Sequence, residues 1–200
     1  IEGDRFIACG DQTNAARCIV YERDGAGGWT EFWLTTVENN PYGEHPRGFG
    51  ASAAISGDTL MVGAYYTQSN PDSGGVYVFE RGSDGVWNES QYFTIPGDYD
   101  NETLGYSLAL DGDMALFGAM DGRNESGTKT GVAYLFKRGD DGLWAESAKL
   151  VPSNGNHDDK FGREVALDGA IALVAAHGTD EDGWSNVGRV YSYSVGCGNG

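Results

Sequence analysis

The sequence predicts an all-β fold built from a repeated antiparallel unit, and three observations point to it. Two phrases recur along the chain at intervals of 55 to 58 residues. Between them, short runs rich in β-branched and aromatic residues are separated by glycine, aspartate and asparagine, as is typical of strands joined by tight turns. Glycine accounts for 32 of the 200 residues, and no segment has a sustained helical periodicity.

The first phrase opens on an aromatic or aliphatic residue followed by glycine, continues through a Gly-Asp-like turn, and closes on two small residues. Its three openings are Phe49-Gly50, Leu104-Gly105 and Phe161-Gly162. The matching ends are Gly63-Ala64, Gly118-Ala119 and Ala175-Ala176. The second phrase is a strand-like run that leads through a glycine-containing turn to a tryptophan, at Trp29, Trp87 and Trp144. Such regularity indicates one structural unit used several times.

Each full repeat is expected to form four short strands, which in the copy starting at residue 49 are 52–56, 59–64, 76–81 and 91–95. A repeated unit of four antiparallel strands is typical of β-propeller blades. The chain, 1–200, then divides into a partial blade 1–48, blades 49–103 and 104–160, and a partial blade 161–200. Two full and two partial repeats predict a segment of a larger propeller, or half of one that another chain completes.

A charged pair accompanies the second phrase in each copy. Arg81 precedes the turn and Glu89 follows the tryptophan, and the same arrangement holds for Arg23 with Glu31 and for Arg138 with Glu146. Because strands 76–81 and 91–95 should form a hairpin, we expect each arginine to pair with the glutamate across that hairpin.

The paired phrases resemble the FG-GAP repeat, known from the propeller of the integrin alpha subunit and from many secreted proteins. The resemblance covers nearly the whole chain and implies a seven-bladed propeller that serves adhesion or ligand binding. The proline expected after Gly-Ala is absent, since Tyr65, Met120 and His177 stand there. Integrin-type repeats also carry a calcium loop inside the first phrase. Only two or three residues occupy that place here, too few to supply six oxygen ligands, so we do not transfer the family's calcium sites.

The chain is strongly acidic, with 30 Asp and Glu residues against 13 Lys and Arg and a net charge of −17. Such a surface repels phosphate backbones, which argues against a nucleic-acid partner. Two interpretations of the charge stay open, solubility in a salty medium or binding of divalent cations, and the first is the simpler. No apolar run approaches the length of a membrane span.

Cysteines and glycosylation sequons both favour an extracellular setting. Cys9 and Cys18 fall on neighbouring predicted strands joined by a short loop, where a disulfide is favoured over two buried thiols; Cys197 is left over. Three sequons lie in predicted loops or at loop edges, at Asn88, Asn101 and Asn124. We therefore expect a secreted or cell-surface glycoprotein of eukaryotic type, with a bacterial exported protein as the alternative.

The long, variable connections should share one face of the propeller, and binding usually resides in long loops on a rigid scaffold. The candidate ligand-binding residues in these loops are Tyr65, Tyr66, Tyr99, Trp184, His45, His157 and His177. The aromatic rings suit a sugar or an anchored partner side chain. For the histidines, ordinary exposed loop residues are a simpler interpretation than a metal site.

Alternating carboxylates in two of these loops are the sequence's metal candidates, at Asp98, Asp100 and Glu102 and at Asp180 and Asp182. Their oxygens are ligands that Ca²⁺ prefers, so calcium is the one cofactor to consider. Solvated acidic loops are the alternative interpretation.

Catalytic motifs are missing: the chain has no Gly-x-Ser-x-Gly, no His-Glu-x-x-His, no phosphate-binding loop and no thiol beside a base. We therefore expect a non-enzymatic extracellular propeller for adhesion, assembly or ligand binding. Its partner would be a protein or glycan, further copies, or the rest of a longer chain. A lectin-like propeller and an accessory propeller of a larger secreted enzyme are the alternatives.

Overall fold

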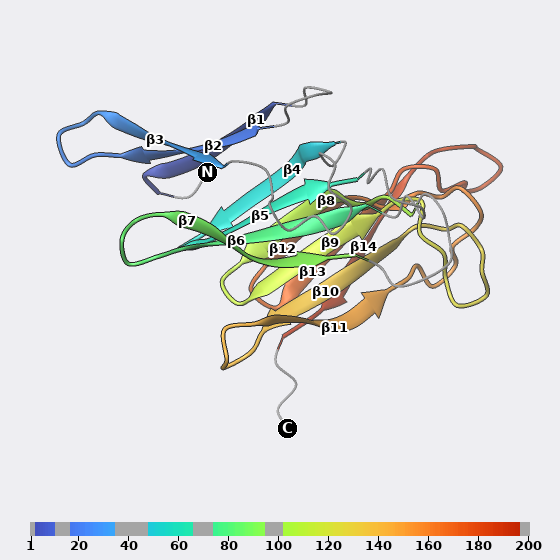
Figure 1. Ribbon diagram of the computed structural model, residues 1–200. Helices are drawn as coiled ribbons and strands as arrows, with labels where there is room; N and C mark the ends of the chain where they lie inside the picture. Colours follow the sequence, from blue (N-terminus) through green and yellow to red (C-terminus); the bar gives the residue numbers. More distant parts are fainter. Residues whose placement is uncertain (1–2, 11–16, 35–47, 66–73, 95–101, 197–200) are drawn as a thin grey trace.

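The computed structural model describes residues 3–10, 17–34, 48–65, 74–94 and 102–196. These ranges contain fourteen strands in four antiparallel sheets and no helix (Figure 1). In particular, the described residues include no helix long and apolar enough to cross a membrane.

Each sheet is a meander of consecutive strands. The first contains β1 (Arg5–Gly10), β2 (Arg17–Arg23) and β3 (Trp29–Leu34). The second contains β4 (Phe49–Ser56), β5 (Thr59–Ala64), β6 (Gly75–Arg81) and β7 (Trp87–Phe93). The third contains β8 (Leu104–Asp111), β9 (Met114–Ala119), β10 (Val132–Arg138) and β11 (Trp144–Leu150). The last contains β12 (Phe161–Asp168), β13 (Ile171–Ala176) and β14 (Arg189–Ser194).

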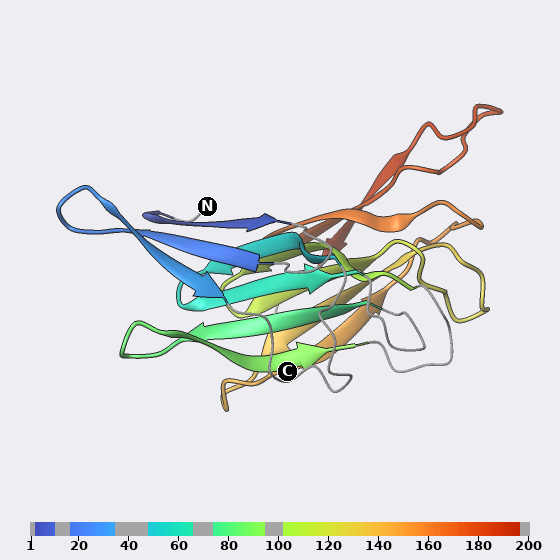
Figure 2. The same ribbon diagram turned by 45° about the horizontal axis from the view of Figure 1, so that its top comes forward.

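The sheets follow one another in chain order, because each packs against the next; Figure 2 shows them from a second side. Strand β8 contacts β4 on one side and β12 on the other, while β1 contacts β4. The first strands of the second, third and fourth sheets therefore lie side by side, as the inner strands of propeller blades do. The all-β arrangement of propeller blades expected from the sequence is confirmed.

A β-bulge at the start of each inner strand explains the Phe-Gly opening of the repeat. The register with the second strand shifts between Phe49 and Ser52, and it shifts at the same place in the next two sheets. The glycine in the bulge has a φ of +88°, +79° and +85° in the three copies, a conformation that favours glycine. The residue before it, Phe49, Leu104 or Phe161, is buried against the preceding sheet.

Close approach between blades explains the glycine that ends the first phrase. A Cβ atom on Gly118 would lie 2.0 Å from the carbonyl oxygen of Gly162 in the next blade. The Ser107 hydroxyl donates a 2.8 Å hydrogen bond to the same carbonyl. Equivalent contacts one blade earlier involve Gly63, Ser52 and Gly105. The backbones of neighbouring blades meet here with no room for a side chain.

Three apolar clusters fill the spaces between successive sheets. One joins Cys18 and Val20 to the second sheet, and the next joins Met61, Val76 and Val78 to the third. The last joins Leu116, Ala133 and Leu135 to the fourth. Each of the first three sheets therefore has one face that is buried by the sheet that follows it.

Two expectations about the strands were wrong in detail. The outermost strand β7 begins at Trp87 rather than at residue 91, because Trp87 is buried in the first cluster and starts the pairing with β6. The inner strand β4 begins at Phe49 rather than at residue 52, because the bulge lies inside the strand rather than before it.

The arginines also do not pair across their own hairpins. The Arg81 guanidinium lies 2.9 Å from a carboxylate oxygen of Glu22, in the preceding blade. Arg138 in turn lies 3.2 Å from Glu80, again one blade earlier. The residues of both pairs lie at the ends of β2, β6 and β10, which occupy equivalent places in successive blades. The pairs therefore connect neighbouring blades and not the strands of one blade.

Candidate functional site

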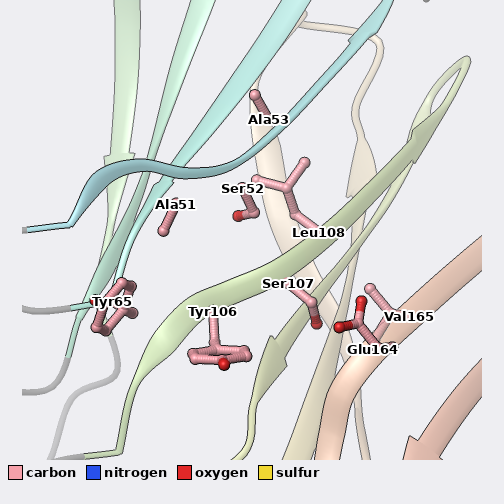
Figure 3. Close-up of a pocket in the computed structure, with 9 residues that line it drawn as sticks. All are labelled: Ala51, Ser52, Ala53, Tyr65, Tyr106, Ser107, Leu108, Glu164 and Val165. Carbon is pink, nitrogen blue, oxygen red and sulfur yellow. The ribbon is translucent and has the colours of Figure 1, made fainter. Parts of the chain in front are cut away.

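A hollow opens along the inner strands of the second, third and fourth blades (Figure 3). It has a volume of about 410 Å³, which is within the usual range for small-ligand sites. Its lining is Ala51, Ser52, Ala53, Tyr65, Tyr106, Ser107, Leu108, Glu164 and Val165. Because inner strands line a propeller's axis, the hollow is an axial site held by three rigid strands.

The bulges place two of the residues that follow them, Ala51 and Tyr106, in the lining of the hollow. The residue after each Phe-Gly or Leu-Gly pair is Ala51, Tyr106 or Arg163, and it follows the bulge glycine directly. The Tyr106 ring meets Tyr65 edge-on at 5.6 Å, and the Arg163 guanidinium lies 5.4 Å from the centre of the Tyr106 ring. Two rings and a guanidinium thus form a continuous row.

Polar groups complete the hollow. The hydroxyls of Ser52 and Ser107 donate hydrogen bonds to the carbonyl oxygens of Gly105 and Gly162, respectively. Both hydroxyl protons are therefore used in hydrogen bonds between neighbouring blades. Glu164 occupies the same register position as these serines but is exposed. The hollow therefore offers aromatic faces and a carboxylate to a polar ligand, and the Arg163 guanidinium lies against one of those rings.

An ionic cluster on the loops beside β8 and β12 centres on Asp121. Its carboxylate lies 2.6 Å from Lys160 and 3.0 Å from Lys129. Burial acts to raise the pKa of Asp121, but the hydrogen bonds from the two lysines outweigh it and hold the pKa below its usual value. Lys160 also pairs with Asp158, which contacts His157. All these charges have protein partners, so the cluster ties loops together.

The predicted ligand residues do not form one site. Tyr65 lies in the axial hollow, whereas His157 is held by Asp158 on a loop. His177 lines a separate hollow with Arg189 and Val190, and Trp184, 74% exposed, lies beyond β13. Three other predicted residues, His45, Tyr66 and Tyr99, lie outside the described residues.

No described group of three or more His, Cys, Asp or Glu side chains is placed to hold a metal ion. Asp180 is exposed and accepts a 2.8 Å hydrogen bond from the backbone of Asn186. Glu102 is 5% exposed. Burial raises its pKa, with Lys149 and Arg123 acting in the opposite direction. Asp98 and Asp100 lie outside the described residues, so a calcium site there stays a prediction.

Sequence reasoning missed Tyr106, Arg163 and Glu164. Their signal was present: the residue after Phe-Gly changes from alanine to tyrosine to arginine within a phrase that otherwise repeats. A variable residue at a fixed bulge is a place where the scaffold presents different chemistry.

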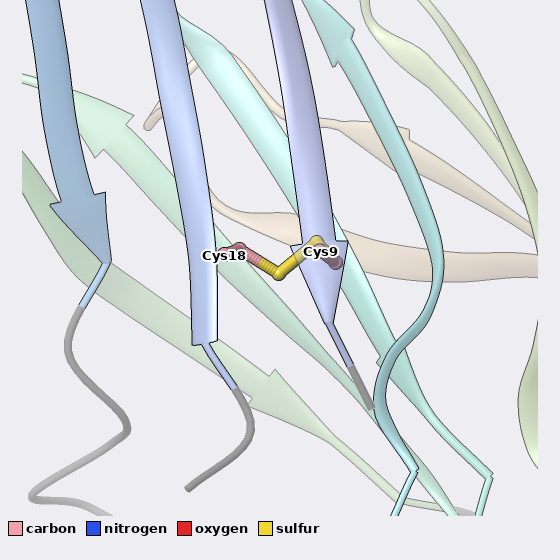
Figure 4. Close-up of a disulfide and its surroundings, with 2 residues drawn as sticks. All are labelled: Cys9 and Cys18. Atoms are coloured by element: carbon pink, nitrogen blue, oxygen red, sulfur yellow. A yellow bond between two sulfur atoms is a disulfide. The ribbon is translucent and has the colours of Figure 1, made fainter. Parts of the chain in front are cut away.

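The Cys9–Cys18 disulfide favoured by the sequence is present (Figure 4). The two residues lie directly opposite each other on β1 and β2, with their Cα atoms 4.1 Å apart. Cys9 and Cys18 also border Gly50, where an added Cβ would lie 2.6 Å from Cys9. The disulfide thus joins the first hairpin where it packs on the second blade. Cys197 lies outside the described residues.

Two of the three sequons can be located. Asn88 is exposed but lies within β7, the outermost strand, rather than in a loop. Asn124 lies in the loop after β9, where its Oδ1 accepts hydrogen bonds from the Ser126 amide and hydroxyl. Asn101 is outside the described part of the chain. Glycosylation itself stays a prediction.

A family model for the FG-GAP repeat matches residues 43–79 and 144–193. Both regions therefore match the FG-GAP repeat. The two matches contain the Phe49-Gly50 and Phe161-Gly162 openings, whose bulges and buried rings recur at Leu104-Gly105 between them. FG-GAP repeats form propeller modules of adhesion-type proteins, generally bind proteins, and are typical of extracellular and cell-surface chains. No curated protein matches the chain.

Proposed function

We propose that this chain, two regions of which match the FG-GAP repeat, is a non-enzymatic extracellular propeller module that binds a partner through its axial hollow. The observation that carries the proposal is the row formed by Tyr65, Tyr106 and Arg163 beside the carboxylate of Glu164. Aromatic rings and arginine are the side chains that most often dominate binding energy at protein interfaces. A projecting peptide segment of a protein partner matches this combination.

A lectin-like role is the second candidate, and the two tyrosines favour it. Sugar rings present an apolar face that stacks on an aromatic side chain, while carboxylate and guanidinium groups satisfy their hydroxyls. Both tyrosines and Glu164 line the hollow, and the Arg163 guanidinium lies against the Tyr106 ring. The difference between the two roles lies in the ligand and not in the residues used.

Tyr106→Ala tests the site for either ligand. A glycan array and a panel of immobilised extracellular-matrix proteins serve as probes, with Trp184→Ala as a matched control that removes an exposed aromatic ring outside the hollow. Loss of a central aromatic anchor should weaken binding by about 30-fold or more. If binding were lost in Trp184→Ala and retained in Tyr106→Ala, the binding site would lie on the loop between β13 and β14. That result would contradict the proposal.

The extracellular setting is supported by the disulfide, since disulfides persist in oxidising compartments. Intact mass measured on protein secreted by eukaryotic cells, before and after deglycosylation and reduction, tests it. We expect glycan mass that maps to Asn88 or Asn124, and a gain of two hydrogens per reduced disulfide. An unglycosylated chain with Cys9 and Cys18 as free thiols would contradict this part of the proposal.

A further inference from the structure

Two recurring positions meet where one blade adjoins the next. One is the residue after the Gly-Ala end of a blade, and the other is the residue after the bulge glycine of the following blade. At the first of these junctions Tyr65 meets Tyr106 edge-on, with ring centres 5.6 Å apart. At the next, Arg163 donates a 3.5 Å hydrogen bond from Nη1 to the sulfur of Met120. The same two positions therefore bring different chemical groups together at neighbouring junctions.

The backbone holds the second of these positions in place. The Tyr106 amide donates a 3.1 Å hydrogen bond to the Thr103 carbonyl, and the Arg163 amide donates a 3.2 Å hydrogen bond to the Lys160 carbonyl. Each bond closes a turn around the bulge glycine at the start of an inner strand. Arg163 therefore extends from a fixed point of the scaffold, as a binding side chain requires.

The Arg163 guanidinium forms no ion pair with any of the described residues, although Glu164 follows it directly in the sequence. It lies 5.4 Å from the centre of the Tyr106 ring and bonds to the sulfur of Met120. A ring face and a thioether are weak partners that carry no net charge. The positive charge of Arg163 is therefore not neutralised by the part of the chain that the structure describes.

This lack of a carboxylate partner is notable in so acidic a chain, which has 30 Asp and Glu residues against 13 Lys and Arg. Five other described arginines each have a carboxylate partner: Arg5, Arg23, Arg81, Arg138 and Arg189. Arg163 is partly buried, and withdrawing a charge from water without a partner is costly. A bound anionic group would remove that cost.

A carboxylate is the anionic group that fits best. A guanidinium presents a planar fork of N–H donors that matches the two oxygens of a carboxylate. The chain has a net charge of −17, so it repels a doubly charged phosphate more strongly than a singly charged carboxylate. The ligand of Arg163 should therefore carry one carboxylate.

The adjoining hollow favours a peptide as the source of this carboxylate. Ala51, Ala53, Leu108 and Val165 give the hollow an apolar lining next to Tyr106 (Figure 3). The serine hydroxyl protons in the lining are used in hydrogen bonds between blades. Few donors are thus left for the hydroxyls of a sugar, whereas an apolar side chain needs none.

We propose that Arg163 binds an aspartate or glutamate side chain of a partner peptide while a neighbouring apolar or aromatic side chain of that peptide enters the axial hollow. The inference rests on the proposed function and names the chemistry of its ligand. Tyr106 serves both parts of the site, since its ring lines the hollow and supports the guanidinium. Glu164, which also lines the hollow, would repel a second acidic side chain there.

Selection of a displayed library of random peptides on the whole chain supplies the probe. We expect the selected peptides to share an acidic residue beside an apolar or aromatic one. Their dissociation constants are then measured by fluorescence anisotropy, and Arg163→Gln should weaken binding about 30-fold. Arg163→Lys keeps the charge without the planar fork and should show an intermediate loss. Lys137→Gln, which removes one positive charge from β10, is the matched control and should bind like wild type.

The amide form of the selected peptide gives the decisive comparison. Replacing its acidic residue by Asn or Gln should weaken binding to wild type by the same factor, and Arg163→Gln should then cause no further loss. Selected peptides without an acidic residue, or equal binding to wild type and Arg163→Gln, would overturn the inference. If Tyr106→Ala still abolished binding in that case, the axial hollow would stand as the site. Peptides that bind Tyr106→Ala like wild type, or a library that yields none, would overturn the inference and the peptide-binding hollow together.

Discussion

Replacing Gly118 by alanine should force the third and fourth blades apart. The new Cβ atom would lie 2.0 Å from the Gly162 carbonyl oxygen and 2.3 Å from the Ser107 hydroxyl oxygen, where real Cβ contacts are essentially never under 3.0 Å. The blades must therefore separate by about 1 Å or the hydrogen bond between Ser107 and Gly162 must break. Overpacking of this kind costs about 1–3 kcal/mol, and we expect a loss of ~3 kcal/mol because the blocking atom is backbone.

Thermal unfolding followed by circular dichroism measures the effect. For a chain of this size 1 kcal/mol shifts Tm by roughly 2–4 °C, so Gly118→Ala should lower Tm by about 6–12 °C. Gly25→Ala is the control, because no atom lies within 4 Å of its added Cβ, and it should change stability by less than ~1 kcal/mol. Equal melting of the two variants would refute the close approach of the blades.

Three further predictions concern stability. Replacing both Cys9 and Cys18 by serine should cost about 2–3 kcal/mol in denaturant unfolding, since a short closed loop is released; an unchanged midpoint would show that the disulfide does not constrain the chain. Asp121→Asn should destabilise the chain at pH 7, because the lysines lower the folded-state pKa of Asp121. The gap between variant and wild type should narrow as pH falls from the ordinary aspartate value of 3.8 through the lowered folded-state pKa, and a gap that does not narrow over that range would argue against the ion pairs. Glu102→Gln should raise Tm at neutral pH, because burial raises the folded-state pKa of Glu102 and disfavours its charge. That gain should vanish below the ordinary glutamate value of 4.5, and a lower Tm at pH 7 would contradict it.

Features set by local chemistry could be predicted from the sequence. Strand β5 has the expected ends because the turn glycine Gly57, at a φ of +56°, fixes its start. Strand β7 was placed too late because its first residues after Trp87 are polar, as suits an outermost strand. The disulfide could be predicted because Cys9 and Cys18 face each other within one hairpin.

Contacts between blades could not be predicted in the same way. The sequence shows Arg138 near Glu146, but the guanidinium reaches Glu80 of the preceding blade because the ends of the third strands are stacked. Tyr106 and Arg163 likewise meet only because each follows a bulge on one of two neighbouring inner strands. A repeat reveals the unit, whereas the contacts between units depend on how far one blade is rotated and shifted against the next.

A pair of double-mutant cycles tests the stacking of successive repeats most directly. One cycle combines Arg138→Ala with Glu80→Ala, and the other combines it with Glu146→Ala, each measured by denaturant unfolding. The stacked-blade structure predicts a coupling of about 0.5–1 kcal/mol between Arg138 and Glu80, which are both partly buried, and none between Arg138 and Glu146. Coupling to Glu146 without coupling to Glu80 would mean that the arginine serves its own hairpin and that the blades do not meet as described.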